Sequence, residues 1–128
     1  MNALKSFAAP TGRTLLALIF VVSGFGKISN FAGTQGYMEA MGVPGVLLPL
    51  VIALEILGGI AIILGWHTRI AAVLLAGFSL LSAVLFHANF GDQMQMIMFM
   101  KNLALTGAFL MLVVHGAGPY SVDERVRG

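Results

Sequence analysis

The chain has 128 residues, of which 59% are hydrophobic and only 9% are charged, and its mean hydropathy is +0.95. About a quarter of the residues of a soluble domain are charged, so this composition excludes an ordinary water-facing surface and predicts a protein that lies in a lipid bilayer. The net charge of +2, carried by basic residues that stand singly, argues against nucleic acid as a partner, and the absence of cysteine excludes disulfides, Fe–S clusters and Cys-ligated metals.

The first predicted helix covers residues 12–29. Lys5 and Arg13 precede the apolar run TLLALIFVVSGFG, an order that is also typical of a signal peptide. The run ends at Lys27, lacks an Ala-x-Ala-like cleavage site and precedes three more apolar segments, so we expect a membrane helix instead. Only 13 residues separate Arg13 from Lys27. The helix must therefore hold one or both near its ends, where long basic side chains snorkel to the interface.

The segment SNFAGTQGYMEAMGVPG follows this helix and is too polar to span a bilayer. Its larger apolar residues predict one face of a short interfacial helix; they are Phe31, Tyr37, Met38 and Met41. The residues from Gly42 to Gly45 then turn the chain into the second span.

Three further helices are predicted at about 46–66, 69–89 and 96–115. A bilayer core needs about 20 mostly apolar residues, and the second helix reaches that length only by including Glu55. The connections between these helices are short, which favours antiparallel neighbours. We therefore predict an all-α fold, an integral membrane four-helix up-and-down bundle that forms a single transmembrane domain over 1–128.

The orientation follows from the positions of the basic residues. The positive-inside rule places the excess of Lys and Arg in the cytoplasm. Two basic residues, Lys27 and Lys101, fall on one side of the predicted bundle. The other side has five, which are Lys5, Arg13, Arg69, Arg125 and Arg127. We therefore expect both termini of this multi-pass protein to lie in the cytoplasm.

Seven short motifs, spread over about 13–123, together resemble the DoxX family. They are SGFGKI, YMEAMGVPG, LEILGG, GWHTR, LFHANF, FMKNLALTG and the closing GAGPYSVDE. The combination is similar to the small single-domain, four-helix members of bacterial inner (cytoplasmic) membranes, so the resemblance implies that fold and location. The family takes its name from subunits linked to thiosulfate:quinone oxidoreduction, and other members are associated with oxidative-stress systems. The resemblance thus also implies a quinone-linked role.

Glu55 is the strongest candidate for a functional residue. An acid at the centre of a membrane helix costs about 2.5–3.5 kcal/mol to insert unless it is neutralised or paired. It should therefore face the bundle interior, where Gly58 and Gly59 let a neighbouring helix approach closely. One interpretation is a structural glutamate that pins the helices together. The other is a proton relay or a ligand for a substrate headgroup.

Three polar residues are predicted near the depth of Glu55. At 1.5 Å per residue, Glu55 lies roughly 13 Å below the outer end of its helix, and Asn102 lies about 9 Å below the end of the last one. Lys27 and His87 lie near the same outer face, whereas the arginines at the helix ends lie at the opposite face. We expect an outward-facing polar pocket in which Glu55 acts as a catalytic proton relay and Lys27, His87 and Asn102 bind a cofactor.

Each of these three neighbours also has a simpler explanation. Lys27 alone is typical of an interface anchor, His87 of a hydrogen-bonded helix end, and Asn102 of an amide that joins helices. Lys101 and Asn102 point about 100° apart on a helix. Only one of the two can face the interior on this geometry, and we expect it to be Asn102.

Other motifs give weaker evidence of a functional site. The run from Met94 to Met100 contains four methionines, whose thioethers suit Cu(I), but they fall on two helix faces and no metal site is expected. Ser79 and Ser82 have no base partner at their level, so serine catalysis is unsupported. A stripe of small residues instead predicts tight packing of the third helix; it consists of Ala72, Ala76, Ser79 and Ala83.

The favoured function is a subunit of a membrane redox or oxidative-stress system that holds a quinone or another lipophilic carrier. Lys27 and His87 would bind the carbonyl oxygens of the carrier, and Glu55 would relay protons. The chain supplies no electron carrier, and no haem is expected. We therefore expect an accessory subunit that acts with a redox partner protein rather than a self-sufficient enzyme. The alternatives are a non-catalytic membrane scaffold and a small proton or solute transporter; the sequence predicts no oligomeric state.

Overall fold

The computed structural model describes residues 3–87 and 90–127 of the chain. In that part of the chain the regular structure is helical, without strands. The elements, in chain order, are α1 (Ala3–Ser29), α2 (Phe31–Ala40), the 3-10 helix η1 (Gly45–Leu47), α3 (Leu48–Leu64), α4 (Thr68–Phe86), α5 (Gln93–His115) and α6 (Val122–Arg127). The segments long and apolar enough to cross a bilayer are Ser6–Ser29, Gly45–Leu64, Thr68–Phe86 and Gln93–His115.

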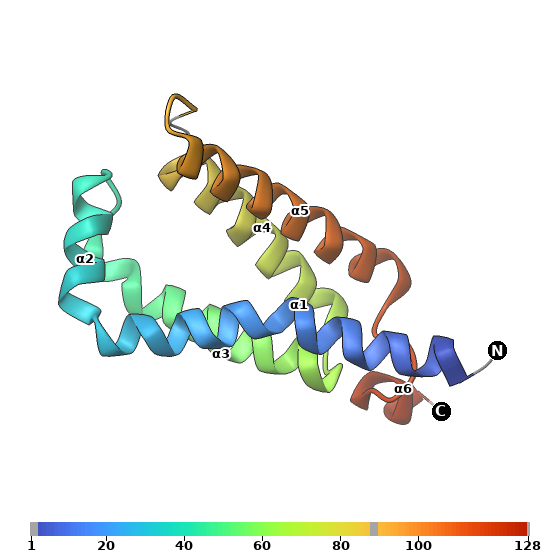
Figure 1. Cartoon of the computed structure of the whole chain (residues 1–128). Helices are drawn as coiled ribbons and strands as arrows, with labels where there is room; N and C mark the ends of the chain where they lie inside the picture. The colour runs from blue at the N-terminus through green and yellow to red at the C-terminus, as the bar shows by residue number, and fades with distance from the viewer. Residues whose placement is uncertain (1–2, 88–89, 128) are drawn as a thin grey trace.

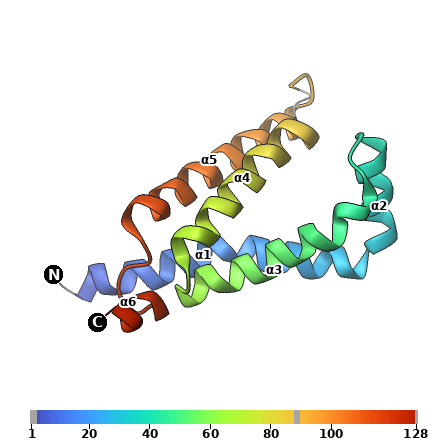
Figure 2. The same cartoon turned by 180° about the vertical axis from the view of Figure 1, so that it is seen from behind.

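The four long helices form two antiparallel pairs, α1 with α3 and α4 with α5 (Figure 1). The pairs meet near the two termini and diverge toward α2, so the bundle has the outline of a V in both views (Figure 2). We call the closed end, with α6, the terminal end, and the open end the α2 end. The predicted four-helix membrane bundle, with a short helix after the first span, is confirmed. The splay between the two pairs was not predicted.

Glycine sets the close contact between α1 and α3. A Cβ atom on Gly59 would lie 2.7 Å from Cγ2 of Val21 and 3.4 Å from the carbonyl oxygen of Ala17. Any side chain there would push α1 away. Gly58 faces α4 instead, where a Cβ atom would be in ordinary contact with Leu75 at 3.4 Å. The predicted close approach of a neighbouring helix is confirmed, and that helix is α1.

An apolar core fills the space between the two pairs toward the terminal end. Phe20 and Phe109 are almost fully buried and lie edge to face, with ring centroids 5.4 Å apart. Ile62 and Leu75 belong to the same cluster and are completely buried. The small-residue stripe of α4 is buried as well, which confirms its predicted tight packing; it consists of Ala72, Ala76, Ser79 and Ala83.

Arg13 joins three segments at the terminal end. It is only 3% exposed, and its guanidinium donates hydrogen bonds to the carbonyl oxygens of Ile62 (3.1 Å), Ala117 (2.6 Å), Pro119 (3.2 Å) and Tyr120 (2.7 Å). The rigid fork of five donors suits this task. The expectation that Arg13 snorkels is wrong, because carbonyl oxygens near the end of α3 and in the loop after α5 offer partners inside the protein.

Asp123 fixes the turn between α3 and α4. Its carboxylate accepts hydrogen bonds from the backbone N–H groups of His67 (2.7 Å) and Thr68 (2.8 Å), which have no partner within α4. Burial opposes ionisation of this carboxyl, but the hydrogen bonds from Thr68 and His67 outweigh it and lower the pKa of Asp123 below its ordinary value. The C-terminal segment thus caps the start of α4.

The helix ends differ from the predicted ones mainly in α1, which begins at Ala3 rather than near residue 12. Pro10 lacks an N–H group and so removes a single backbone hydrogen bond near the start of this helix. α3 ends at Leu64 because Gly65 takes the left-handed conformation, with φ at 69°. α5 begins at Gln93, capped by Asp92, which accepts a hydrogen bond from the N–H of residue 94 at 2.9 Å. Residues 88 and 89 of the third predicted helix lie outside the described residues.

Candidate functional site

A cavity of about 260 Å³ lies between the two helix pairs in the half toward the α2 end. Its lining comes from α1, α2, α3, α4 and α5, and includes the C-cap residue of α4. The four site residues predicted from the sequence all line it, and they are Lys27, Glu55, His87 and Asn102. Further polar residues in the lining are Ser23, Thr34, Tyr37, Ser79, Ser82 and Lys101. The rest of the lining is apolar, with Phe20 and Phe78 on the side of the core.

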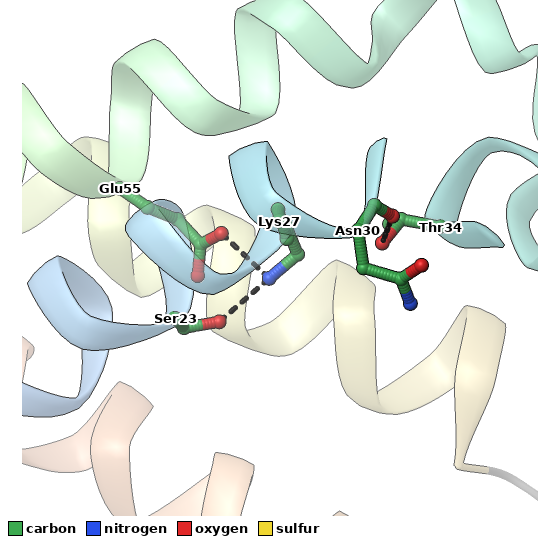
Figure 3. Close-up of polar contacts among 5 residues, drawn as sticks. All are labelled: Ser23, Lys27, Asn30, Thr34 and Glu55. Carbon is green, nitrogen blue, oxygen red and sulfur yellow. Dashed lines mark hydrogen bonds and ion pairs between the residues drawn. The ribbon is translucent and has the colours of Figure 1, made fainter. Parts of the chain in front are cut away.

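Glu55 and Lys27 form an ion pair on the wall made by α1 and α3 (Figure 3). Nζ of Lys27 lies 2.7 Å from Oε1 of Glu55, and the two side chains are 26% and 4% exposed. At this distance the two opposite charges attract strongly. The same ammonium donates a hydrogen bond to Oγ of Ser23 at 2.6 Å. Lys27 therefore turns into the protein toward the acid rather than serving only as an interface anchor.

The facing wall, on α4 and α5, presents hydrogen-bonding groups without partners in the described part of the chain. Ser79 is 2% exposed, and its hydroxyl makes no hydrogen bond with the described residues. Asn102 is 7% exposed, and its backbone carbonyl accepts a bond from Thr106, whereas its side-chain amide makes none among those residues. Buried polar groups are normally hydrogen-bonded. The hydroxyl of Ser79 is an exception among the described residues, and the side chain of Asn102 lines the same cavity with hydrogen-bonding capacity that a ligand can use.

Aromatic and imidazole groups line the cavity at the α2 end. Tyr37 of α2 stacks on Phe86 of α4, with ring centroids 5.5 Å apart, and so joins α2 to the α4–α5 pair. His87 follows Phe86, and its Nδ1 lies 3.1 Å from Oε1 of Gln95. This distance is within hydrogen-bonding range, and the donor depends on the tautomer of the imidazole.

The site differs from its prediction in one respect, the position of Lys101. This residue lines the cavity together with Asn102, so the prediction that only Asn102 faces the interior is wrong. Their side chains do diverge by about 100° around the helix, but the splayed pairs leave an interior wide enough to receive both. The sequence could not reveal this width, because it depends on the angle between the pairs.

Three serines of the lining were missed as site residues. The sequence predicted Ser79 as a packing residue and offered no base partner that would make Ser79 or Ser82 catalytic. A serine in an apolar helix does not by itself indicate a binding site. Ser23 did carry a usable signal: it precedes Lys27 by one helical turn, the spacing at which two side chains meet on one helix face.

The methionines of the run 94–100 lie in different environments. Met98 lines the cavity, whereas Met94 and Met100 are 65% and 56% exposed. The thioethers therefore diverge, as predicted from the helix spacing. Among the described residues, no group of three or more His, Asp or Glu side chains comes together in a way that would hold a metal ion.

Comparison with known protein families shows which family this helical bundle belongs to. Residues 8–88 of the chain match the DoxX family. The chain belongs to the DoxX family. The part that matches DoxX runs from α1 to the residues just after α4, so it contains Lys27, Glu55 and His87, while Asn102 on α5 lies beyond it.

Two relatives from Escherichia coli (strain K12) match this DoxX chain over nearly its whole length. Inner membrane protein YqjF is 51% identical over 124 residues, which cover 97% of this chain and 95% of the relative. Inner membrane protein YphA is 38% identical over 140 residues, covering 98% of this chain and 100% of the relative. A Bacillus subtilis (strain 168) protein named "Putative oxidoreductase CatD" is 31% identical over 108 residues, covering 78% and 80%. No solved structure gave a significant match.

Proposed function

We propose that this DoxX protein is an inner-membrane subunit of a redox or oxidative-stress system that binds a quinone or a similar lipophilic carrier in the cavity between its helix pairs. The observation that carries the proposal is the cavity itself, where the Lys27–Glu55 ion pair faces the unpartnered groups of Ser79 and Asn102. Ligand sites are typically apolar clefts with a few placed polar groups. The word oxidoreductase in the name of CatD points in the same direction.

The size of the cavity suits a ring headgroup. A cavity of about 150 Å³ lined by apolar residues is enough to bind benzene, so 260 Å³ has room for one ring or two fused rings. The hydrophobic tail of such a carrier would extend out of the cavity into lipid. Phe20 and Phe78, already packed edge to face at 6.4 Å, offer apolar ring surface to the headgroup.

The polar groups of the cavity match the chemistry of a quinone. Its carbonyl oxygens accept hydrogen bonds, and Lys27 and His87 can donate them from different helices. Reduction to the quinol requires two protons, and the carboxyl group of Glu55 and the imidazole of His87 are the groups of the lining suited to general acid–base transfer of protons. The chain has no cysteine and carries no electron carrier of its own among its side chains. The electrons must therefore come from a partner protein.

The closed side of the cavity argues for a binding site over a transport path. Between the cavity and the terminal end lies the apolar core, with Leu75 and Phe109 completely buried. Beyond it, Arg13 ties α1 to the C-terminal loop with hydrogen bonds to Ala117 and Tyr120. A solute crossing the bundle would have to displace both layers. A ligand that enters and leaves by the α2 end needs to displace neither.

The test is the quinone content of the purified protein. Wild type and the Glu55→Gln variant are purified from the same membranes, extracted with organic solvent and analysed by mass spectrometry. We expect quinone to copurify with wild type and to fall several-fold in Glu55→Gln, since the amide keeps the shape but loses the charge that holds Lys27. Glu39→Gln, the same change at an exposed position of α2, should leave the content unchanged. No quinone in any of the three proteins would favour the membrane scaffold, and equal content in all three would contradict binding at the Lys27–Glu55 pair.

A further inference from the structure

The charges that line the cavity do not balance. Two lysines, Lys27 and Lys101, line it, but Glu55 is the one acidic residue in the lining. Glu55 is already paired with Lys27 at 2.7 Å. Lys101 has no carboxylate oxygen within 4.0 Å in the described part of the chain, and its Nζ makes a single polar contact there, with the thioether of Met98 at 3.7 Å. The wall formed by α5 therefore carries a positive charge without a counter-ion.

Other residues that line the cavity can also donate hydrogen bonds to an anionic oxygen. Asn102, the next residue, is buried with its side-chain amide free of bonds to the described residues. Ser79, on the neighbouring α4, has a buried hydroxyl that likewise lacks a partner among them. Ammonium, amide and hydroxyl can all donate hydrogen bonds, and bonds from such donors to a charged oxygen are about twice as strong as those to a neutral one.

We propose that the cavity selects a lipophilic acid, a ligand with an apolar body and one acidic oxygen, and that Lys101 binds the ionised oxygen. This inference rests on the proposed function, because it specifies the chemistry of the carrier held at the same site. Two kinds of molecule share that chemistry: a quinone whose ring bears an acidic hydroxyl group, and a fatty acid. Lys101 is a specificity-determining residue in either case, and Lys27 keeps its own partner on the opposite wall.

The inference predicts a difference between matched ligands. A neutral quinone leaves the ammonium of Lys101 without a counter-ion, whereas an ionised hydroxyquinone supplies one in a partly water-excluded site, where charges interact more strongly than in water. We expect the acidic ligand to bind about tenfold more tightly than its neutral counterpart, which corresponds to about 1.4 kcal/mol. Replacing Lys101 with an uncharged residue should remove this difference between the acidic and the neutral ligand.

The experiment measures calorimetric binding to the full-length protein in nanodiscs of zwitterionic phospholipid. The probes are a 2-hydroxy-3-alkyl-1,4-naphthoquinone, its 2-methoxy counterpart, which cannot ionise, and dodecanoate as an acid without a ring. Wild type is compared with Lys101→Gln, which removes the charge, and with Lys101→Arg, which keeps it. The preference for the hydroxyquinone should vanish in Lys101→Gln and persist in Lys101→Arg, and the arginine variant shows that substitution at this position preserves folding.

The outcomes separate the two proposals. Equal binding of the hydroxy and methoxy compounds by wild type overturns the inference about Lys101 but leaves carrier binding intact. A preference that survives in Lys101→Gln also overturns it, because another group must then bind the acid. Binding of neither quinone contradicts the proposed function, and dodecanoate binding that depends on Lys101 would then identify a fatty acid as the lipophilic acid. Quinone binding without dodecanoate binding identifies the acidic quinone.

Discussion

Removing one partner of the Lys27–Glu55 pair should destabilise the protein more than removing both charges. The atoms Nζ and Oε1 are 2.7 Å apart, and at an effective dielectric constant of about 20 two unit charges at that distance attract by about 6 kcal/mol. Desolvation offsets much of this attraction, and Lys27 keeps 26% of its side chain exposed. We therefore expect a coupling of about 4 kcal/mol between the two residues in a double-mutant cycle.

The variant Lys27→Met leaves a carboxylate that is only 4% exposed without its cation. We expect it to lose about 3 kcal/mol of unfolding free energy. Adding Glu55→Gln to this variant removes the stranded charge and should restore about 2 kcal/mol. The assay is a double-mutant cycle of reversible unfolding in mixed micelles, with the wild type, the two single variants and the double variant measured under one condition.

A second cycle provides the control. Glu39 is exposed and forms no ion pair with the described residues, so Lys27→Met and Glu39→Gln should combine additively, to within about 0.5 kcal/mol. The reasoning is refuted if the Lys27–Glu55 cycle is equally additive, because the short contact would then contribute nothing to stability. It is also refuted if the double variant is less stable than Lys27→Met alone.

Three further predictions concern packing and the terminal end. The variant Arg13→Lys should lose about 2–4 kcal/mol of unfolding free energy, because an ammonium cannot satisfy the four carbonyl oxygens that Arg13 binds. The control is Arg69→Lys at an exposed position, which should lose less than about 1 kcal/mol. Equal losses in the two variants would contradict the role of Arg13 in joining the segments of the terminal end. Because the pKa of Asp123 is lower in the folded than in the unfolded protein, its contribution to the free energy of unfolding is complete above about pH 4. This contribution is lost as the pH falls through the pKa of the folded state. Unfolding measured against pH should therefore show an acid-labile step that Asp123→Asn lacks, and an identical acid profile in both proteins would be the contrary result. The variant Gly59→Ala should lose about 1–3 kcal/mol of unfolding free energy, because the new Cβ atom meets Val21. The control Gly107→Ala should lose none, because nothing lies within 4 Å of a Cβ atom at that position. Similar losses in both variants would show that the close contact between α1 and α3 does not contribute to stability.

Much of the fold could be predicted because hydropathy is a local property. Four apolar stretches of bilayer length stand out in the sequence, and their short connections constrain the topology. The depth of Glu55 within its helix was also readable from residue counts, and it correctly pointed to Lys27 as a possible neighbour. The cytoplasmic location of both termini, inferred from the basic residues, stays a prediction.

The remaining features depend on contacts between distant segments. The carbonyl partners of Arg13 lie as far away as Tyr120, in a loop whose conformation no pattern announces. The shared exposure of Lys101 and Asn102 to the cavity follows from the splay of the two pairs, which is a property of how the helices cross. A prediction made for each helix separately assumes that the helices form a closed bundle. It therefore places Lys101 and Asn102 in different environments.

The central claim, that the cavity between the helix pairs holds a lipophilic carrier, is tested most directly by photoaffinity mapping. A quinone with a photoreactive group on its ring is bound to the protein in nanodiscs, illuminated, and located by peptide sequencing. We predict adducts on both walls, within residues 19–27 and 98–105, that are suppressed by excess unlabelled quinone. Adducts confined to lipid-facing positions such as Leu110 and Val114, or labelling that unlabelled quinone does not suppress, would contradict the claim.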